Sequence, residues 1–167
     1  MSAPEPCCDL ITAEVVAFVH GGGVLLVGTA SADRVPALPR GFAPRIAPDR
    51  RTVDVFVGRA QSAACLANLP PGAAISVTVG NPVDYRGIQI KGTAAGHRGA
   101  AAGDADWLER FRRGSDESMA QVGIPPAQNA HLWCRDMVCI TFVPSAIFRQ
   151  TPGPGAGSAV NAGSPWT

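Results

Sequence analysis

The chain has 167 residues, a formal net charge of +1 from 14 basic and 13 acidic side chains, and a hydrophobic content of 46%. These values suit one globular domain with a buried core, without the basic excess of a nucleic-acid-binding surface. No run of about 18 apolar residues predicts a membrane span, and residues 1–9 lack the features of a secretory signal. The five cysteines, an odd number without regular spacing, indicate reduced thiols. We therefore expect a cytoplasmic protein that binds neither nucleic acid nor membranes.

The first third of the chain predicts short strands joined by turns. Four strands are predicted, over residues 13–20, 24–30, 35–47 and 52–58. The first two are apolar runs on either side of three glycines at 21–23, a pattern typical of a β-hairpin. The third contains three inner prolines. Because proline donates no backbone hydrogen bond to a neighbouring strand, we expect an edge strand or a bent one here.

The rest of the chain combines strands with two helices. A short helix is predicted over residues 61–69, with Ser62 as a candidate N-cap, and a longer amphipathic helix over residues 102–122, with a candidate break at Gly114-Ser115. Three more strands are predicted, over residues 75–79, 85–94 and 137–143. Residues 151–167 are rich in Gly, Pro and Ala. We expect them to form a tail, either disordered or laid over another part of the chain, outside a single domain of residues 1–150.

This order of elements predicts a mainly β (α+β) fold. Six or seven strands with short links favour a closed or nearly closed antiparallel barrel with two or three peripheral helices. A doubly wound parallel sheet would need a helix after nearly every strand, and too few helices are predicted.

Two arginines occupy the proline-containing strand at 35–47. Arg40 and Arg45 could each donate two parallel hydrogen bonds to a phosphate group. Their five-residue separation places them on opposite faces of a flat strand, unless Gly41 and Pro44 introduce a bulge. Two solvated surface arginines are the alternative interpretation.

A second candidate anion site lies where the strand at 52–58 leads into the next helix. Arg59 and Ser62 could join the backbone N–H groups of the first helical turn on a phosphate. The alternative is a plain N-cap without a ligand.

A third candidate segment is the strand at 85–94. Alternation places Tyr85, Gln89 and Lys91 on one face, opposite two core isoleucines, and that face could grip a flat polar ring. Ordinary outward-facing polar residues are the alternative interpretation.

No catalytic or metal-binding residue is indicated. The sequence His-Gly-Gly-Gly at 20–23 resembles the oxyanion loop of some esterases, but no G-x-S-x-G nucleophile motif follows it. His131, Cys134 and Cys139 are loosely spaced and lack a second ligand pair, so no metal site is predicted.

The strand order and three segments together resemble the pyridoxamine 5'-phosphate oxidase-like flavoproteins, and in particular a compact bacterial branch of that family. The segments are VPALPRGFAPRIAPDRRTVDVFV at 35–57, NPVDYRGIQIKG at 81–92 and VPSAIFRQTPGPGAG at 143–157. The resemblance runs from Ala13 to Gly157. It implies a split barrel of Greek-key type that forms a homodimer, with FMN bound in two equivalent clefts between the subunits.

The resemblance also implies which residues bind FMN. Arg40 and Arg45 match an Arg-x-x-x-x-Lys segment that lies along the flavin, with Arg in place of Lys and a one-residue slip. The end of the next strand touches the flavin phosphate, and a later strand adds contacts to the ring. The implied cofactor-binding residues are Arg40, Gly41, Arg45, Val57, Gly58, Arg59, Ser62, Gln89 and Lys91.

The chain departs from the family's pattern at two places. The oxidases carry Ser-Arg-Lys, whose basic pair binds phosphate, where this chain has Ser62-Ala63-Ala64; Arg59 is the candidate substitute. The oxidases also use a C-terminal Trp and Arg for the substrate. The glycine-rich tail has no counterpart, which disfavours pyridoxamine phosphate as the substrate.

Three functional hypotheses follow. The leading one is an FMN-dependent oxidoreductase that acts on a small molecule at a flavin in the dimer interface, with the flavin performing the redox chemistry. The alternative is a non-catalytic flavin- or small-ligand-binding module that has lost FMN or binds it without turnover. The third is a structural dimer module without a ligand.

Overall fold

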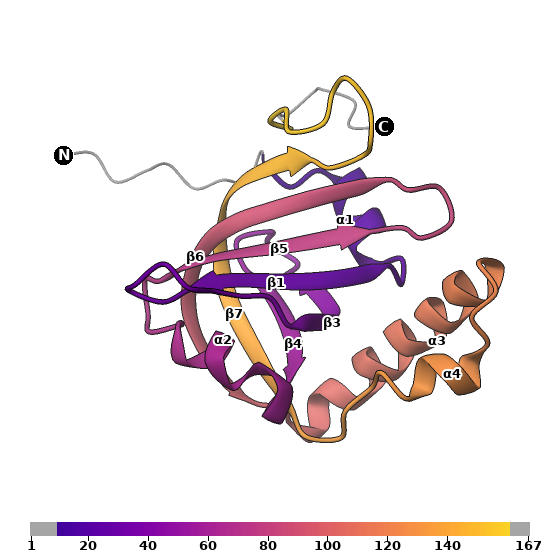
Figure 1. Ribbon diagram of the computed structural model, residues 1–167, viewed down its shortest axis with the longest axis horizontal. Helices are drawn as coiled ribbons and strands as arrows, with labels where there is room; N and C mark the ends of the chain where they lie inside the picture. Colours follow the sequence, from indigo (N-terminus) through magenta and orange to yellow (C-terminus); the bar gives the residue numbers. More distant parts are fainter. Residues whose placement is uncertain (1–9, 161–167) are drawn as a thin grey trace.

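The computed structural model describes residues 10–160. The arm predicted at 1–9, with Cys7 and Cys8, and residues 161–167 of the tail lie outside this part of the chain. Seven antiparallel strands form one sheet: β1 (Val24–Ala30), β2 (Pro36–Ala37), β3 (Arg40–Ile46), β4 (Val53–Gly58), β5 (Ala74–Gly80), β6 (Gly87–Gly99) and β7 (Met137–Arg149). Their order is β2-β1-β3-β4-β7-β6-β5, and β1 also pairs with β5 (Figure 1). Six strands therefore close into a barrel, which confirms the predicted mainly β fold.

Alternating apolar residues fill the barrel. Ile75, Val77 and Val79 of β5 are buried while the residues between them are half-buried, as the sequence pattern predicts. Ile88 and Ile90 of β6 are fully buried beside them. Strand β4, in the middle of the sheet, is almost completely buried. Burial of these side chains is the main favourable term for folding.

The two longest strands, β6 and β7, have 13 residues each and bend around the barrel (Figure 1). Their pairing shifts register between Lys91 and Gly92 and again between Ala94 and Gly96, so β-bulges supply the bend. Gly92 has no room for a side chain, because a Cβ atom there would overlap the carbonyl oxygen of Val143.

Residues 13–20 form helix α1 (Ala13–His20), so the predicted strand and its hairpin around 21–23 are wrong. The Thr12 side chain accepts a hydrogen bond from the backbone N–H of Val15 at 3.3 Å and caps the helix. Val15 and Val19, four residues apart, are both fully buried on one helix face. The β-branched residues suggested a strand, but the cap and the buried helical face decide the conformation.

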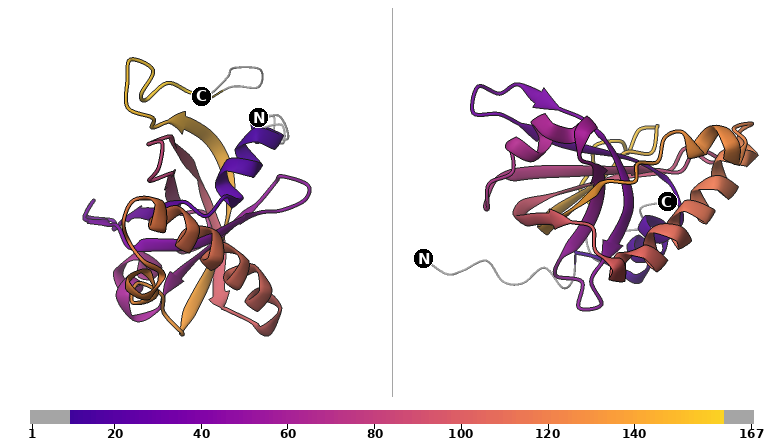
Figure 2. Two further views of the ribbon diagram at one scale, coloured as in Figure 1. Left: turned by 90° about the vertical axis from the view of Figure 1, so that its right-hand side faces the viewer. Right: turned by 90° about the horizontal axis from the view of Figure 1, so that it is seen from below.

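Three further α-helices lie outside the barrel. They are α2 (Ala63–Ala67), after the 3₁₀ turn η1 (Ala60–Ser62); α3 (Ala105–Gln121), after the 3₁₀ turn η2 (Ala102–Asp104); and α4 (Pro126–Ala130). Helices α3 and α4 form a hairpin beside the barrel (Figures 1 and 2). The described chain thus has four α-helices where two or three were expected. None of those helices, all within residues 10–160, has the length and apolar character to cross a membrane.

Helix α3 runs unbroken through Gly114-Ser115, so the predicted break is wrong. The backbone of Gly22, with φ at 84°, lies against the helix at Gly114. A Cβ atom at Gly22 would overlap the Gly114 carbonyl carbon. The glycine at position 22 thus lets the link between α1 and β1 touch the helix directly.

The described part of the tail lies along β7. The Val160 N–H donates to the Ile147 carbonyl at 2.8 Å, and the Arg149 N–H donates to the Ser158 carbonyl at 2.9 Å. The Val160 side chain is 4% exposed. Residues 157–160 therefore pair with the end of β7, whereas most of residues 152–156 form an exposed loop. The domain boundary at residue 150 stays a prediction.

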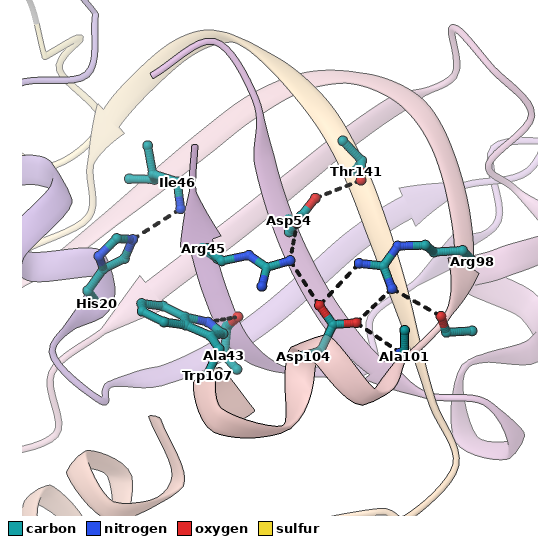
Figure 3. Close-up of polar contacts among 11 residues, drawn as sticks. His20, Ala43, Arg45, Ile46, Asp54, Arg98, Ala101, Asp104, Trp107 and Thr141 are labelled. Carbon is teal, nitrogen blue, oxygen red and sulfur yellow. Dashed lines mark hydrogen bonds and ion pairs between the residues drawn. The ribbon is translucent and has the colours of Figure 1, made fainter. Parts of the chain in front are cut away.

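His20 connects α1 to β3 and α3. Its Nε2 accepts a hydrogen bond from the Ile46 N–H at 3.0 Å, and its ring meets the edge of Trp107 with the centroids 4.7 Å apart (Figure 3). Burial, aided by the nearby Arg110 guanidinium, lowers the pKa of His20 from its ordinary value of 6.5. The neutral form is therefore the one that the fold stabilises.

We expect stability to fall as the pH decreases from about 7 to about 5, because the unfolded chain takes up a proton on His20 that the folded chain resists. The contribution is complete above pH 6.5 and is lost as the pH falls towards the lower folded pKa. Urea unfolding at several pH values checks this. His20→Gln, which keeps an acceptor for Ile46, should flatten the profile, whereas the exposed control His97→Gln should not.

Candidate functional site

A cavity of about 530 Å³ lies where β3 starts and β4 ends. One wall comes from Pro39, Arg40, Phe42, Gly58 and the η1 turn. The other wall is the segment of residues 131–136 between α4 and β7, here called the pocket loop. The volume is in the range of small-molecule sites.

The pocket loop is fixed to the end of β4. The Arg59 N–H donates to the Asp136 carbonyl at 3.0 Å, and Arg59 Nε lies 3.0 and 3.1 Å from the two Asp136 carboxylate oxygens. The Cys134 thiol approaches Gln61 Oε1 at 3.6 Å. Gly58 permits this contact, because a Cβ atom there would lie 2.5 Å from the Cys134 sulfur. Arg59, predicted to bind phosphate, therefore pairs with the loop.

Three residues that line this cavity each carry a buried donor atom without a hydrogen-bond partner within the described residues. The atoms are Arg40 Nε, Ser62 Oγ and Trp133 Nε1. The Ser62 residue is only 2% exposed. Buried polar groups are almost always paired, so three unpaired donors on residues around one cavity point to a missing acceptor.

Arg40 carries the positive charge of this cluster. Burial lowers the pKa of its guanidinium, and no carboxylate within residues 10–160 offsets that effect. The guanidinium lies 5.7 Å from the centre of the Phe42 ring, and Phe42 packs on Trp133 with the ring centroids 4.9 Å apart. A cation held against aromatic rings beside unpaired donors suits an oxyanion.

Arg45 is engaged elsewhere, although β3 does contain the bulge that the sequence allowed. The bulge lies between Phe42 and Arg45, where Ala43 has a positive φ of 44°. The Arg45 guanidinium donates to Asp54 at 2.7 Å and to Asp104 at 3.0 Å (Figure 3). The structure therefore places Arg40 in the cavity and Arg45 in an ion-pair network outside it.

Asp104 is the centre of that network. Arg98 donates to its two oxygens at 2.7 and 3.1 Å, and the Ala101 N–H donates at 2.9 Å (Figure 3). The Asp54 carboxylate, on β4, also accepts from Thr141 at 2.6 Å. The Arg98 hydrogen bonds hold the pKa of Asp104 far below its usual range. These contacts fix the start of α3 to β3, β4 and β6.

Gln89 and Lys91 lie apart from the first cavity. Gln89 Nε2 donates to Thr78 at 3.3 Å, and Lys91 Nζ lies 4.8 Å from the centre of the Phe148 ring. Lys91 lines a second cavity of about 590 Å³ between β1, β2, β5 and β6, next to the 65% exposed Leu38. Tyr85, expected on the same face, precedes β6 and is exposed with a φ of 59°.

Gly41 and Val57 pair across β3 and β4 and are buried behind the cavity wall. Of the nine residues that the resemblance implied, Arg40, Gly58 and Ser62 line the first cavity, and Arg59 borders it through Asp136. The sequence analysis missed Trp133. Its only sequence signal is a tryptophan in the apolar part of a segment otherwise rich in polar residues.

His131 and Cys134 line the first cavity, whereas Cys139 is buried in β7. Within residues 10–160, no group of three or more His, Cys, Asp and Glu side chains is placed to hold a metal ion. Cys65, Cys134 and Cys139 are free thiols.

Similarity to solved structures identifies the fold, whereas the sequence comparisons found no match. No protein-family model and no curated protein matches the sequence. Among solved structures, HupZ of Group A Streptococcus aligns at a TM-score of 0.52 and 14% identity, over 88% of this chain and 98% of that one. An FMN-binding protein from Syntrophomonas wolfei aligns at a TM-score of 0.49 and 12% identity, over 83% and 84% of the two chains.

A third match is a Clostridium acetobutylicum protein of the pyridoxinephosphate oxidase family, related to general stress protein 26, with a TM-score of 0.47, 12% identity and coverage of 89% and 92%. At such identities the likeness concerns the fold. Together with the closed six-stranded barrel, the likeness to HupZ confirms the predicted split-barrel fold.

Proposed function

We propose that the protein binds FMN, with the flavin phosphate in the cavity at the start of β3. One observation supports this proposal above all: Arg40 and Ser62, both predicted from the sequence to contact phosphate, line one cavity, and each has a buried donor atom without a partner. A phosphate group has enough acceptor oxygens to satisfy them and a charge that offsets the Arg40 guanidinium.

We further propose that the protein is an oxidoreductase acting on a small molecule, and that it is cytoplasmic, which its free thiols support. FMN, when bound, supplies the electron transfer. The chain supplies position and charge: Arg40 orients the anion, and the Phe42 and Trp133 rings form an apolar wall that excludes water. No side chain in the cavity is assigned a catalytic role.

A homodimer is part of the same proposal. Gln89 and Lys91, implied to touch the flavin, lie on a different part of the barrel from Arg40. In a homodimer, Arg40 of one subunit and Gln89 and Lys91 on β6 of the second subunit can contact the same cofactor. The exposed Leu38 at the second cavity is an apolar contact for such a partner. Gel filtration with light scattering measures the oligomeric state.

Arg40→Ala is expected to weaken FMN binding well beyond tenfold, because charge-assisted hydrogen bonds contribute roughly 1.5–3 kcal/mol each and about 1.4 kcal/mol corresponds to tenfold. Quenching of flavin fluorescence during titration measures the affinity. Arg51→Ala, which removes an exposed charge away from the cavity, is the matched control. Arg45→Ala should mainly lower stability, since two carboxylates hold that guanidinium.

Equal FMN affinities of Arg40→Ala and the wild type would show that the phosphate binds elsewhere. A colourless wild-type protein that fails to bind added FMN would contradict the proposal that this protein binds a flavin.

The alternative, a non-catalytic flavin-binding module, is favoured by the absence of the basic pair at Ala63 and Ala64. A yellow protein whose flavin no nicotinamide donor reduces would support that alternative.

A further inference from the structure

We propose that Trp133 contacts the flavin phosphate directly through its indole N–H, and that the pocket loop thereby supplies the donor that Ala63 and Ala64 cannot. This inference rests on the proposed binding of FMN. It adds to the site a residue that neither the sequence pattern nor the resemblance indicated.

The indole nitrogen of Trp133 has no partner within the described chain. Trp133 Nε1 is buried, and Trp133 lines the same cavity as Arg40 and Ser62, whose Nε and Oγ atoms are also buried and unpaired. The indole of Trp107, by contrast, donates to the Ala43 carbonyl at 2.9 Å. An indole N–H is a donor only, so the partner that Trp133 lacks is an acceptor. Because the unpaired atoms of Arg40 and Ser62 are donors as well, an anion with several oxygens is the ligand that suits residues around this cavity.

Contacts within the protein hold the indole in place before a ligand arrives. Its ring packs on Phe42 at an interplanar angle of 46°, and the backbone N–H of Trp133 donates to the Ala130 carbonyl at 3.2 Å. The ion pair between Arg59 and Asp136 fixes the far end of the pocket loop to β4. A donor that is already oriented loses little conformational entropy on binding, so more of the hydrogen-bond energy appears as affinity.

The charged groups around the cavity also favour a neutral donor at Trp133. Ala63 and Ala64 stand where the oxidases carry two basic residues, and both are exposed in this structure. Arg59, the candidate substitute, is neutralised by Asp136. The phosphate site therefore combines one buried cation with two neutral donors, Ser62 and Trp133. Arg59 contributes by positioning the loop that carries Trp133.

The test compares Trp133→Phe with the wild type in titrations with FMN and with riboflavin, which lacks the phosphate. Phenylalanine keeps the aromatic contact with Phe42 but has no N–H group. We expect the dissociation constant for FMN to rise roughly ten- to a hundredfold, as for a lost hydrogen bond to a charged group. The riboflavin dissociation constant should stay unchanged. Trp107→Phe, the control, removes an indole whose N–H is already paired and should leave FMN affinity unaltered.

The outcomes separate this inference from the proposed function. A wild type that binds FMN, together with a Trp133→Phe variant of equal affinity, overturns the role of Trp133 alone. Equal losses for FMN and riboflavin also overturn it, because they assign the effect to ring packing. A wild type that binds no FMN overturns both proposals. Thermal unfolding of each variant verifies that the fold is intact.

Discussion

Replacing Asp104 with Asn is expected to lower the free energy of unfolding by about 2–3 kcal/mol, because hydrogen bonds to a charged group contribute roughly 1.5–3 kcal/mol. The Asp104 side chain is 5% exposed and accepts hydrogen bonds from Arg45 and Arg98, which are themselves partly exposed. Asparagine keeps an acceptor for the Ala101 N–H but removes the charge that both guanidiniums share. The melting temperature should fall by roughly 5–10 °C.

The matched control is Glu109→Gln on α3, which breaks ion pairs with Arg112 and Arg113 on the protein surface. Its melting temperature should hardly change, since exposed ion pairs contribute little. Because the pKa of Asp104 is lowered by folding, its contribution is present above the ordinary value of 3.8 and is lost as the pH falls below that value. Asp104→Asn should lack this part of the acid dependence. Equal melting temperatures for the two variants would show that the network is not stabilising.

Gly92→Ala is the second change with a large expected effect. An added methyl group would overlap the Val143 carbonyl oxygen and crowd the Phe142 ring at 2.9 Å. Because the obstacle includes main chain, the pairing of β6 and β7 would have to shift where the barrel bends. We expect a loss of about 3 kcal/mol or more in the free energy of unfolding, measured in urea.

Gly103→Ala is the control for Gly92→Ala. A Cβ atom at Gly103 would meet nothing within 4 Å, and its backbone conformation suits any residue. Its stability should stay the same or rise slightly through the lower entropy of the unfolded chain. A Gly92→Ala protein as stable as Gly103→Ala would mean that the bend tolerates a side chain.

The barrel could be predicted because each of its strands can be recognised from the pattern of its own residues. In β5, apolar and polar residues alternate at 75–79, and each side chain takes the face that the pattern assigns. The strand predicted for residues 13–20 was wrong, because a short apolar run with several valines fits a buried helix face as well as a strand. The sequence signal that favours a helix here is the capping residue Thr12.

The candidate site was harder to predict, because its contacts join distant parts of the chain. Arg40 and Arg45 are chemically alike and close in sequence, but Arg45 forms an ion pair with Asp104, which is 59 residues away. Trp133 lies at the cavity because the pocket loop joins α4 to β7, packs on Phe42 and pairs with Arg59 through Asp136. Sequence patterns report local conformation, and such long-range pairings follow from the complete topology.

The α3–α4 hairpin and the pocket loop are fastened to the barrel by two ion-pair systems of unequal exposure. At the start of α3, Asp104 is shielded from solvent, whereas at the far end the Arg59 and Asp136 side chains are 52% and 68% exposed. Dissolved salt screens exposed charges far more than buried ones. Added salt should therefore weaken the Arg59–Asp136 ion pair more than the contacts of Asp104. The backbone hydrogen bond from Arg59 to Asp136, which carries no net charge, holds the end of the pocket loop at any ionic strength.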